Sequence, residues 1–241
     1  MVFPVCAWKS FEAFTRLFGS DGNPLMKLYS YWRSSAAYRV RIALNYKQIP
    51  YQQVTPNLAR QEQRTAEYLA VNPQGLVPAL ELDGEHAGKI ISQSLAIIEY
   101  LESVKKNPSL FPEDSLDRAR VNAMAQAIAC DIHPLNNQRV LRYLKNEFKQ
   151  DDAAVDRWYA RWICDGFVAV ESWARELSAD GRYLFGDAVT LADVLLVPQI
   201  YNARRFKVDL QAFPTLLSVD KHLCSLPAFA AAAPEVQPDS A

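Results

Sequence analysis

The spacing of apolar and polar residues divides the chain into two parts. Between residues 26 and 104, short runs with strand-like alternation are separated by segments whose apolar residues recur at helical spacing. These patterns predict strands at 26–32, 51–57 and 72–82, a hairpin over 82–92, and helices at 36–47, 60–71 and 92–104. The order β-α-β-α-β-β-α predicts a small mixed sheet with helices on its faces.

Two of the predicted helices have a defined buried side. In "AAYRVRIALNYK" the residues at helical spacing are Val40, Ala43 and Leu44, and in "SQSLAIIEYLESV" they are Leu95, Ile98 and Leu101. Asp83-Gly84 and Gly88 supply the turn of the hairpin between them.

Strand-like patterns stop after the segment "KKNPSLFPED", residues 105–114. Two prolines and several charges there indicate a linker. Helical spacing then continues through 117–148, 155–177 and 190–206, which predicts an all-α domain. We therefore expect one domain over 26–107, an all-helical domain over 113–241, and an Ala/Pro-rich tail after Phe229 that is frayed.

The first 25 residues stand apart from this pattern. The segment "FEAFTRLF" has Phe11, Phe14, Leu17 and Phe18 on one helical face, but it lacks the continuous apolar region of a signal peptide. Residues 1–25 are an extension for which three interpretations stay open, a mis-called start, a vector remnant or a loosely attached helix, and they do not enter the fold argument.

Composition restricts the class of ligand. Half of the 241 residues are hydrophobic, and Lys+Arg (26) nearly balances Asp+Glu (27), a formal charge of -1 that gives no net field for nucleic acid or an anionic membrane. The four cysteines are far apart without metal-ligand spacing, which indicates reduced thiols in a cytoplasmic setting and no metal site. No apolar run reaches the roughly 20 residues of a membrane span.

Ser34 and Ser35 precede the helix that starts near residue 36. Serines at this position are ordinary helix N-caps. The same position, between the end of a first strand and a helix N-terminus, also allows donors and the helix dipole to stabilise an anion such as a thiolate.

Two further places pair a structural and a functional interpretation. Val77-Pro78 marks the entry of a strand, and a cis bond there would expose the Val77 backbone to an extended peptide. Ser92-Gln93-Ser94 opens a helix, so its hydroxyls and free N–H groups can cap that helix or receive a carboxylate. A thiolate site, a peptide-binding edge and a carboxylate site together are what glutathione requires.

The strings "SYWRSSAAYRVRIAL", "NPQGLVPAL" and "SQSLAIIEYLE" resemble the thioredoxin-like domain of glutathione S-transferases, specifically the zeta class. "DIHPLNNQRVLRYL" and "GDAVTLADVLLVPQIYNARRFKVDL" resemble the helical domain of the same class, so the resemblance covers roughly residues 26–230. It implies a glutathione-dependent enzyme that forms a homodimer and isomerises maleylacetoacetate to fumarylacetoacetate in tyrosine and phenylalanine catabolism.

The resemblance also implies roles for individual residues. Ser34, with Ser35 beside it, would hydrogen-bond the glutathione sulfur, and Arg205 would meet a substrate carboxylate. The glutathione-binding residues that it implies are Ser34, Ser35, Arg39, Gln63, Val77, Pro78, Gln93 and Ser94, joined by His133, Asn137, Gln138 and Arg139 from the helical domain.

Ala36 departs from the family pattern. Many members of the class read Ser-Ser-Cys where this chain reads Ser34-Ser35-Ala36, so the reactive sulfur must come from glutathione. This fits isomerisation, in which the thiolate adds to a cis double bond, rotation follows and elimination restores the thiol.

A diketo dicarboxylate substrate needs cationic partners. The candidates are Arg33, Arg39, Arg41, Arg139, Arg142, Arg204 and Arg205, of which Arg205 ranks first and Arg33 and Arg39 second. An arginine on a helix is, however, more often a solvated charge or a stem that covers apolar surface.

Two features are assigned to structure. Thr190 and Asp193 have the spacing of a capping box, with Val189 placed for a hydrophobic staple. The aromatic residues at helical spacing, Trp158, Trp162, Phe167 and Trp173, indicate core packing.

Two alternatives to the isomerase stay open. One is a transferase that conjugates small electrophiles such as α-haloacids, and it uses the same site. The other is a binding protein that keeps the fold without catalysis, because fold does not fix function.

Overall fold

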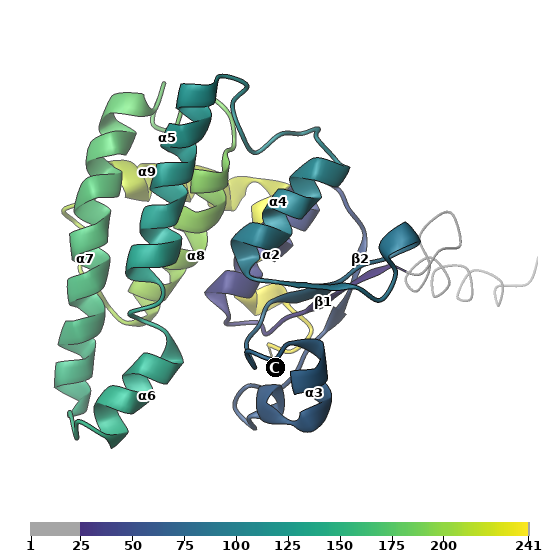
Figure 1. Cartoon of the computed structure of the whole chain (residues 1–241). Helices are drawn as coiled ribbons and strands as arrows, with labels where there is room; N and C mark the ends of the chain where they lie inside the picture. The colour runs from purple at the N-terminus through teal and green to yellow at the C-terminus, as the bar shows by residue number, and fades with distance from the viewer. Residues whose placement is uncertain (1–24, 241) are drawn as a thin grey trace, which may run out of the picture. The chain divides into compact units, whose positions relative to one another are not determined.

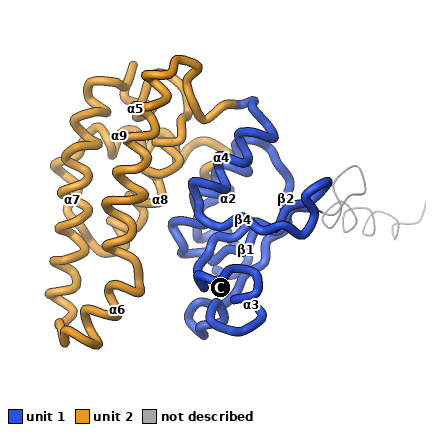
Figure 2. The backbone as a smooth tube through the Cα atoms, viewed as in Figure 1, with its two compact units in different colours: residues 1–108, 231–241 blue, residues 109–230 orange. Residues whose placement is uncertain are grey.

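The computed structural model describes residues 25–240, which form two compact units (Figures 1 and 2). The first unit contains residues 25–108 together with 231–240, and the second contains residues 109–230. The boundary between the units, after Pro108, falls inside the segment 105–114. The helical face expected over residues 11–18 lies outside the described residues.

The first unit is built on a four-stranded mixed sheet in the order β2-β1-β3-β4. Strand β1 (Met26–Tyr29) pairs in parallel with β2 (Tyr51–Val54) and antiparallel with β3 (Ala79–Glu81), which pairs antiparallel with β4 (Ile90–Ser92). The helices are α2 (Ser35–Tyr46), α3 (Ala66–Val71) and α4 (Ser94–Val104), with short 3-10 helices at Glu62–Arg64 and Gly84–His86. The predicted element order is therefore confirmed.

Alternation along β1 explains how the helices are divided between the two faces. Leu28 is fully buried, and its neighbour Tyr29 points to the opposite face, where its ring meets Tyr68 of α3 edge to face at 5.9 Å. Helices α2 and α4 pack against each other on the other face of the sheet (Figure 1).

The predicted buried side of α2 is correct, because Val40, Ala43 and Leu44 are all fully buried. For α4 the prediction is right at two of three positions. Ile98 and Leu101 are fully buried, whereas Leu95 is partly exposed and Ile97 takes the inner position.

The second unit is helical, as expected. Helices α5, α7, α8 and α9 form a bundle joined by a π-helix and α6 (Figure 1). Their bounds are α5 Ser115–Gln126, the π-helix Ala127–Ile132, α6 Gln138–Asn146, α7 Asp152–Leu177, α8 Leu191–Arg205, α9 Pro214–Ser225 and α10 Pro227–Ala230. Gly166 allows α7 to approach the π-helix, because a Cβ there would overlap the Ile132 side chain.

The aromatic residues of α7 are less uniform than predicted. Phe167 is fully buried and meets Phe213 edge to face at 5.6 Å, so its assignment to the core is correct. Trp158, Trp162 and Trp173 are only half-buried. The Trp158 indole N–H donates to the Leu135 carbonyl at 2.9 Å, which ties α7 to the segment after the π-helix.

The capping box at the start of α8 is present. The Asp193 carboxylate accepts hydrogen bonds from the Thr190 N–H at 2.7 Å and the Thr190 hydroxyl at 2.9 Å. Its other oxygen accepts from the Leu184 N–H at 2.8 Å, so the box also fixes the loop before the helix. Val189 is buried, as the hydrophobic staple requires.

The C-terminal tail is not frayed, and it does not belong to the helical unit. Residues 231–240 group with the sheet-containing unit, and they include a 3-10 helix at Pro234–Val236. Ala232 is fully buried, and its carbonyl accepts from Arg41 Nε of α2 at 3.0 Å. The Ala/Pro-rich composition of this segment predicted an unstructured tail because the sequence does not show that the buried Arg41 binds it.

Candidate active site

Ser34 stands in the turn that joins β1 to α2. Its N–H donates to the Tyr31 carbonyl at 2.9 Å, and its Oγ accepts from the Ala37 N–H at 3.2 Å, which makes it the N-cap of α2. The hydroxyl uses a lone pair for the cap, so its proton can still be donated to another acceptor. Capping and anion binding are therefore compatible functions of this one side chain.

Ser35, Arg39 and Ser94 are the buried polar residues at the N-termini of two helices. Ser35 is the first residue of α2, and Arg39, only 2% exposed, follows one turn later. Arg39 Nη1 donates to the Oγ of Ser94, the first residue of α4, at 3.3 Å. A guanidinium beside a helix N-terminus favours an anion there, because the helix dipole and the charge act in the same direction.

The Val77-Pro78 peptide bond is cis, and β3 begins immediately after it. The Leu76 carbonyl just before it accepts from the Tyr68 hydroxyl and from Asn72 Nδ2, both at 2.7 Å. Among the described residues, no hydrogen bond involves the N–H or C=O of Val77. The Val77 backbone is therefore held in place on one side and remains open to an extended peptide on the other.

Gln93 precedes α4 in an uncommon backbone conformation, with φ 73° and ψ 122°. Sparsely populated conformations of this kind cost about 1–3 kcal/mol and cluster at binding sites. The Gln93 carboxamide donates to Gln74 Oε1 at 2.9 Å. Gln63 adds a buried Oε1 that has no hydrogen-bond partner within residues 25–240, so an amine or N–H of a ligand would satisfy it.

The eight residues expected to bind glutathione through the first unit all belong to it. They supply a hydroxyl proton at the α2 N-terminus, an open strand edge at Val77 and a cationic α4 N-terminus. These groups match a thiolate, a peptide backbone and a carboxylate, so the residues present fit glutathione.

The helical unit contributes the remaining expected residues. His133 follows the π-helix, and Asn137 is the N-cap of α6, its Oδ1 accepting from the Arg139 N–H at 3.1 Å. Gln138 and Arg139 are exposed on the first turn of α6. The Asn137 oxygen thus already has a structural use, whereas the side chains of Gln138 and Arg139 point away from the core.

The structure separates the candidate arginines. Arg204 pairs with Asp220, whose carboxylate is almost fully buried, at 2.7 Å. Arg205 is exposed, has no acidic partner among the described residues, and lies with its guanidinium 5.1 Å from the Phe206 ring centroid. Burial raises the pKa of Tyr159, which stacks on Phe206, and the Arg205 charge opposes that rise. Of the two adjacent arginines, Arg205 is therefore the one that remains open to a substrate.

Arg41 cannot serve a substrate carboxylate, contrary to its inclusion among the candidates. It is fully buried, and its guanidinium donates to acceptors within its own unit. Arg33 is exposed, and its guanidinium lies 4.1 Å from the centroid of the Trp32 ring.

Three residues near the Val77 edge were missed by the sequence interpretation: Tyr68, Asn72 and Gln74. The signal for Asn72 was present, because an Asn-Pro dipeptide starts turns and Asn72 Oδ1 accepts from the Gln74 N–H at 3.1 Å. Tyr68 gave no comparable signal, since it lies on a six-residue helix with little periodicity.

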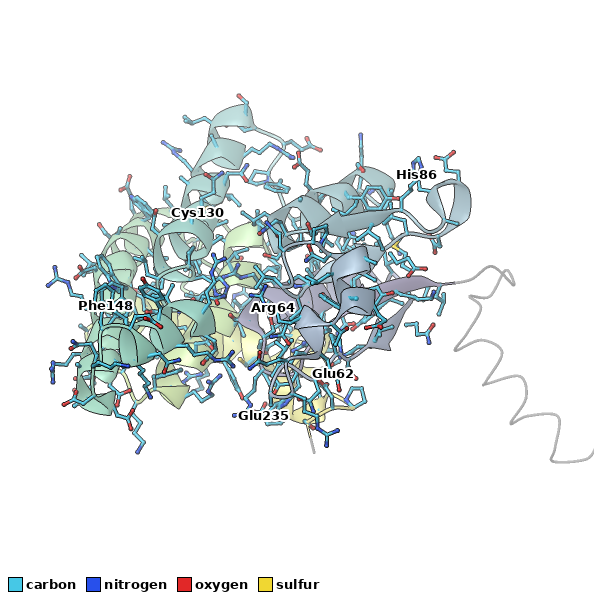
Figure 3. All side chains as sticks on the ribbon, turned by 60° about the horizontal axis from the view of Figure 1, so that its bottom comes forward. Glu62, Arg64, His86, Cys130, Phe148 and Glu235 are labelled. Carbon is cyan, nitrogen blue, oxygen red and sulfur yellow. The ribbon has the colours of Figure 1, made fainter. Side chains whose placement is uncertain are left out.

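The described thiols are not among the residues expected to form the site. Cys130 is exposed in the π-helix (Figure 3), Cys164 lies on α7 and Cys224 on α9. Partial burial, with the Asp220 carboxylate 3.6 Å away, raises the pKa of Cys224 to about 12. Within residues 25–240, no group of His, Cys, Asp and Glu is arranged to hold a metal ion, and no helix is both long and apolar enough to cross a bilayer.

Comparison with known proteins supports the same assignment. Residues 24–103 match the family model of the glutathione S-transferase N-terminal domain. The chain is 47% identical to maleylpyruvate isomerase from a Ralstonia species over 90% of this chain and 100% of the relative. It is 49% identical to a probable maleylacetoacetate isomerase from Vibrio cholerae over 88% of this chain and 97% of the relative.

Solved structures extend the similarity to the whole fold. The holo structure of a maleylpyruvate isomerase, a bacterial zeta-class glutathione S-transferase, has a TM-score of 0.85 at 47% identity and covers 89% of this chain and 100% of its own. A maleylacetoacetate isomerase from Anaeromyxobacter dehalogenans 2CP-1 with bound dicarboxyethyl glutathione and citrate has a TM-score of 0.81 at 40% identity, covering 90% and 94%. The chain therefore belongs to the zeta class of the glutathione S-transferase family.

Proposed function

We propose that the protein catalyses the glutathione-dependent cis–trans isomerisation of maleylacetoacetate to fumarylacetoacetate, a step of tyrosine and phenylalanine catabolism. The observation that carries this proposal is the geometry of Ser34. Its Oγ accepts from the Ala37 N–H while its own proton remains free for donation at the α2 N-terminus. Bound glutathione supplies the thiol that adds to the cis double bond as a thiolate and is regenerated by elimination after rotation.

Ser34 lowers the pKa of that thiol. A hydroxyl proton directed to the sulfur and the positive end of the α2 dipole both favour the thiolate over the thiol. Ser35, which is almost fully buried, is the first residue of α2 and stands next to Ser34. Because Ala36 carries no sulfur, Ser34 acts on the cofactor's thiol and on no thiol of its own turn.

The rest of the first unit holds the peptide part of glutathione. The open N–H and C=O of Val77 pair with its backbone, and the N-terminus of α4 at Gln93-Ser94 receives a carboxylate. Arg39 adds positive charge beside Ser94. The orphaned Gln63 Oε1 accepts from a donor of the ligand.

We assign substrate binding to a residue of the helical unit. Arg205 binds a substrate carboxylate, because its guanidinium is exposed and has no acidic partner among the described residues. The glutathione-binding residues proposed for this unit on the family resemblance are His133, Asn137, Gln138 and Arg139. No thiol or metal of the protein takes part in the reaction as proposed.

Maleylpyruvate is a second candidate substrate. The 47% identity to a maleylpyruvate isomerase over its whole length favours it about as strongly as the maleylacetoacetate isomerase relatives favour maleylacetoacetate. Both compounds carry an activated cis double bond beside a carboxylate, so one thiolate site suits both. We further propose a homodimer in the cytoplasm.

The deciding experiment supplies each substrate with glutathione at a small fraction of the substrate concentration. If the protein is an isomerase, all of the substrate should be converted to the fumaryl product, and the concentration of free thiol at the end should equal that at the start. Stoichiometric loss of glutathione would instead assign conjugation of electrophiles such as α-haloacids. Failure of the folded protein to bind immobilised glutathione would assign a non-catalytic role. The ratio of kcat/KM for the two maleyl compounds identifies the preferred substrate.

A further inference from the structure

The C-terminal segment, residues 231–240, is given a fixed shape by its own polar groups. The Gln237 side chain is buried and donates from Nε2 to the Ala233 carbonyl at 2.7 Å and the Ala231 carbonyl at 3.1 Å. Pro234 is also buried. These contacts give the segment a fixed path, which leads to the turn that carries Ser34.

Arg41 forms the first connection between this segment and the turn. Its guanidinium is fully buried and donates to the Ala232 carbonyl at 3.0 Å, the Ser30 hydroxyl at 3.0 Å and the Trp32 carbonyl at 3.0 Å. A weaker contact at 3.4 Å reaches the Tyr31 carbonyl. Because a guanidinium donates in one plane, these acceptors hold the chain from residue 30 to residue 32 against the tail.

Asp239 forms the second connection. Its Oδ2 accepts from the Trp32 N–H at 3.0 Å, across 207 residues of sequence. The backbone of Trp32 is therefore held on both sides, its carbonyl by Arg41 and its N–H by Asp239.

The turn passes this constraint on to Ser34. The Ser34 N–H donates to the Tyr31 carbonyl at 2.9 Å, the same carbonyl that Arg41 approaches. The direction of the Ser34 hydroxyl depends on the backbone of residues 31–34, since its Oγ must also reach the Ala37 N–H. Loss of a contact at Trp32 would therefore broaden the positions of this hydroxyl.

We propose that Asp239 is a positioning residue for the thiolate site, so that the C-terminal segment acts with Arg41 as a clamp on the Ser34 turn. This inference rests on the proposed function, in which Ser34 donates to the glutathione sulfur. In this proposal Asp239 acts through the Trp32 N–H. The preorganisation of a donor, rather than its mere presence, determines how strongly it stabilises a developing anion.

The test compares Asp239→Ala with a matched control in the same segment, Glu235→Ala. Glu235 is an exposed carboxylate (Figure 3), and its removal changes the net charge by the same amount. We expect Asp239→Ala to lower kcat/KM about tenfold, as for a partly buried donor left without its acceptor, while Glu235→Ala stays near wild type. Asp239→Asn keeps an acceptor oxygen and should restore most of the loss.

A second readout does not depend on turnover. The ultraviolet absorbance of the bound thiolate, titrated with pH, reports the pKa of the enzyme-bound glutathione thiol. A tenfold loss of thiolate stabilisation corresponds to about one pKa unit upward. Deletion of residues 238–241 should reproduce the Asp239→Ala shift, because it removes the same acceptor and leaves Gln237 and the Arg41–Ala232 contact in place.

Each outcome is interpreted per folded molecule, with the folded fraction taken from circular dichroism. An unchanged thiol pKa in Asp239→Ala, or an equal loss in Glu235→Ala, overturns the clamp. A lower melting temperature with an unmoved thiol pKa assigns Asp239 to stability alone and also overturns it. If wild-type protein binds glutathione but isomerises neither maleyl compound, the proposed function fails, and the thiol titration still decides the clamp.

Discussion

Replacement of Ser34 tests the thiolate site most directly, because one oxygen has two separable functions there. In Ser34→Ala the Ala37 N–H loses its acceptor, which removes the N-cap of α2 and should lower the free energy of unfolding by about 1 kcal/mol. The same change removes the donor to the sulfur. A hydrogen bond to a charged group contributes about 1.5–3 kcal/mol, so the pKa of the bound thiol should rise by about 1–2 units.

Ser34→Gly separates the two functions. Glycine at an N-cap is only a few tenths of a kcal/mol worse than serine, so this variant should unfold close to wild type. It should nevertheless lose activity like Ser34→Ala, by about a hundredfold to a thousandfold, the range seen when one positioned donor is removed. Ser34→Thr keeps both the acceptor and the donor and serves as the positive control.

The assay is the pH dependence of kcat/KM with glutathione below its KM, together with the thiolate absorbance of the binary complex. In both measurements the apparent pKa of the bound thiol should move to higher pH in Ser34→Gly and stay at the wild-type value in Ser34→Thr. If Ser34→Gly retained the wild-type acid limb and turnover, Ser34 would be a helix cap only, and the proposed origin of the thiolate would be wrong.

Substitution of the two adjacent arginines, Arg204 and Arg205, should have different effects. Arg205→Ala should raise KM for the maleyl substrate about tenfold or more and leave stability unchanged. Arg204→Ala leaves the Asp220 carboxylate buried without its cation, so it should lower the free energy of unfolding by about 1–2 kcal/mol, less than for a fully buried pair. KM values and urea unfolding of both variants check these expectations. Burial raises the pKa of Asp193 from 3.8 to about 6, although hydrogen bonds from Leu184 and Thr190 oppose the rise. Between about pH 4 and pH 6 the folded state therefore binds a proton that the unfolded state has lost, so the contribution of Asp193 to stability falls as pH rises through this range. In the Asp193→Asn variant that dependence is absent, so the difference in free energy of unfolding between wild type and variant should change by at most about 3 kcal/mol across the window. Urea unfolding of both proteins at pH 4 and pH 7 measures this difference, and the same difference at both pH values would contradict the prediction.

Local patterns were sufficient for most of the fold. The strand and helix order of residues 26–104 follows from alternation, helical spacing and turn residues, and Val40, Ala43 and Leu44 are buried as their spacing predicts. Leu95 was assigned wrongly because α4 has apolar residues on more than one side, and the buried face is centred between Ile97 and Ile98, which leaves Leu95 at its edge.

Long-range polar contacts could not be predicted in this way. The tail was expected to fray because alanine and proline carry little apolar surface, yet Ala232 is buried against a guanidinium that the sequence alone suggested for a substrate. Nothing in the local sequence of Arg41 distinguishes it from Arg39, two residues away on the same helix. Only the arrangement of acceptors around each one shows that Arg41 holds backbone and Arg39 holds the start of α4.

Ser34 shows why local interpretation underestimates such a site. A hydroxyl has one proton and two lone pairs, so the cap at Ala37 and the donation to a thiolate draw on different parts of the same group. The cap even favours the donation, because it fixes the oxygen and leaves the proton to point elsewhere. The structural and catalytic interpretations of "RSSA" are therefore not competing explanations. The surrounding groups distinguish a serine that only caps a helix from one that also activates a thiol. Here these groups are the open Val77 edge and the α4 N-terminus with Arg39.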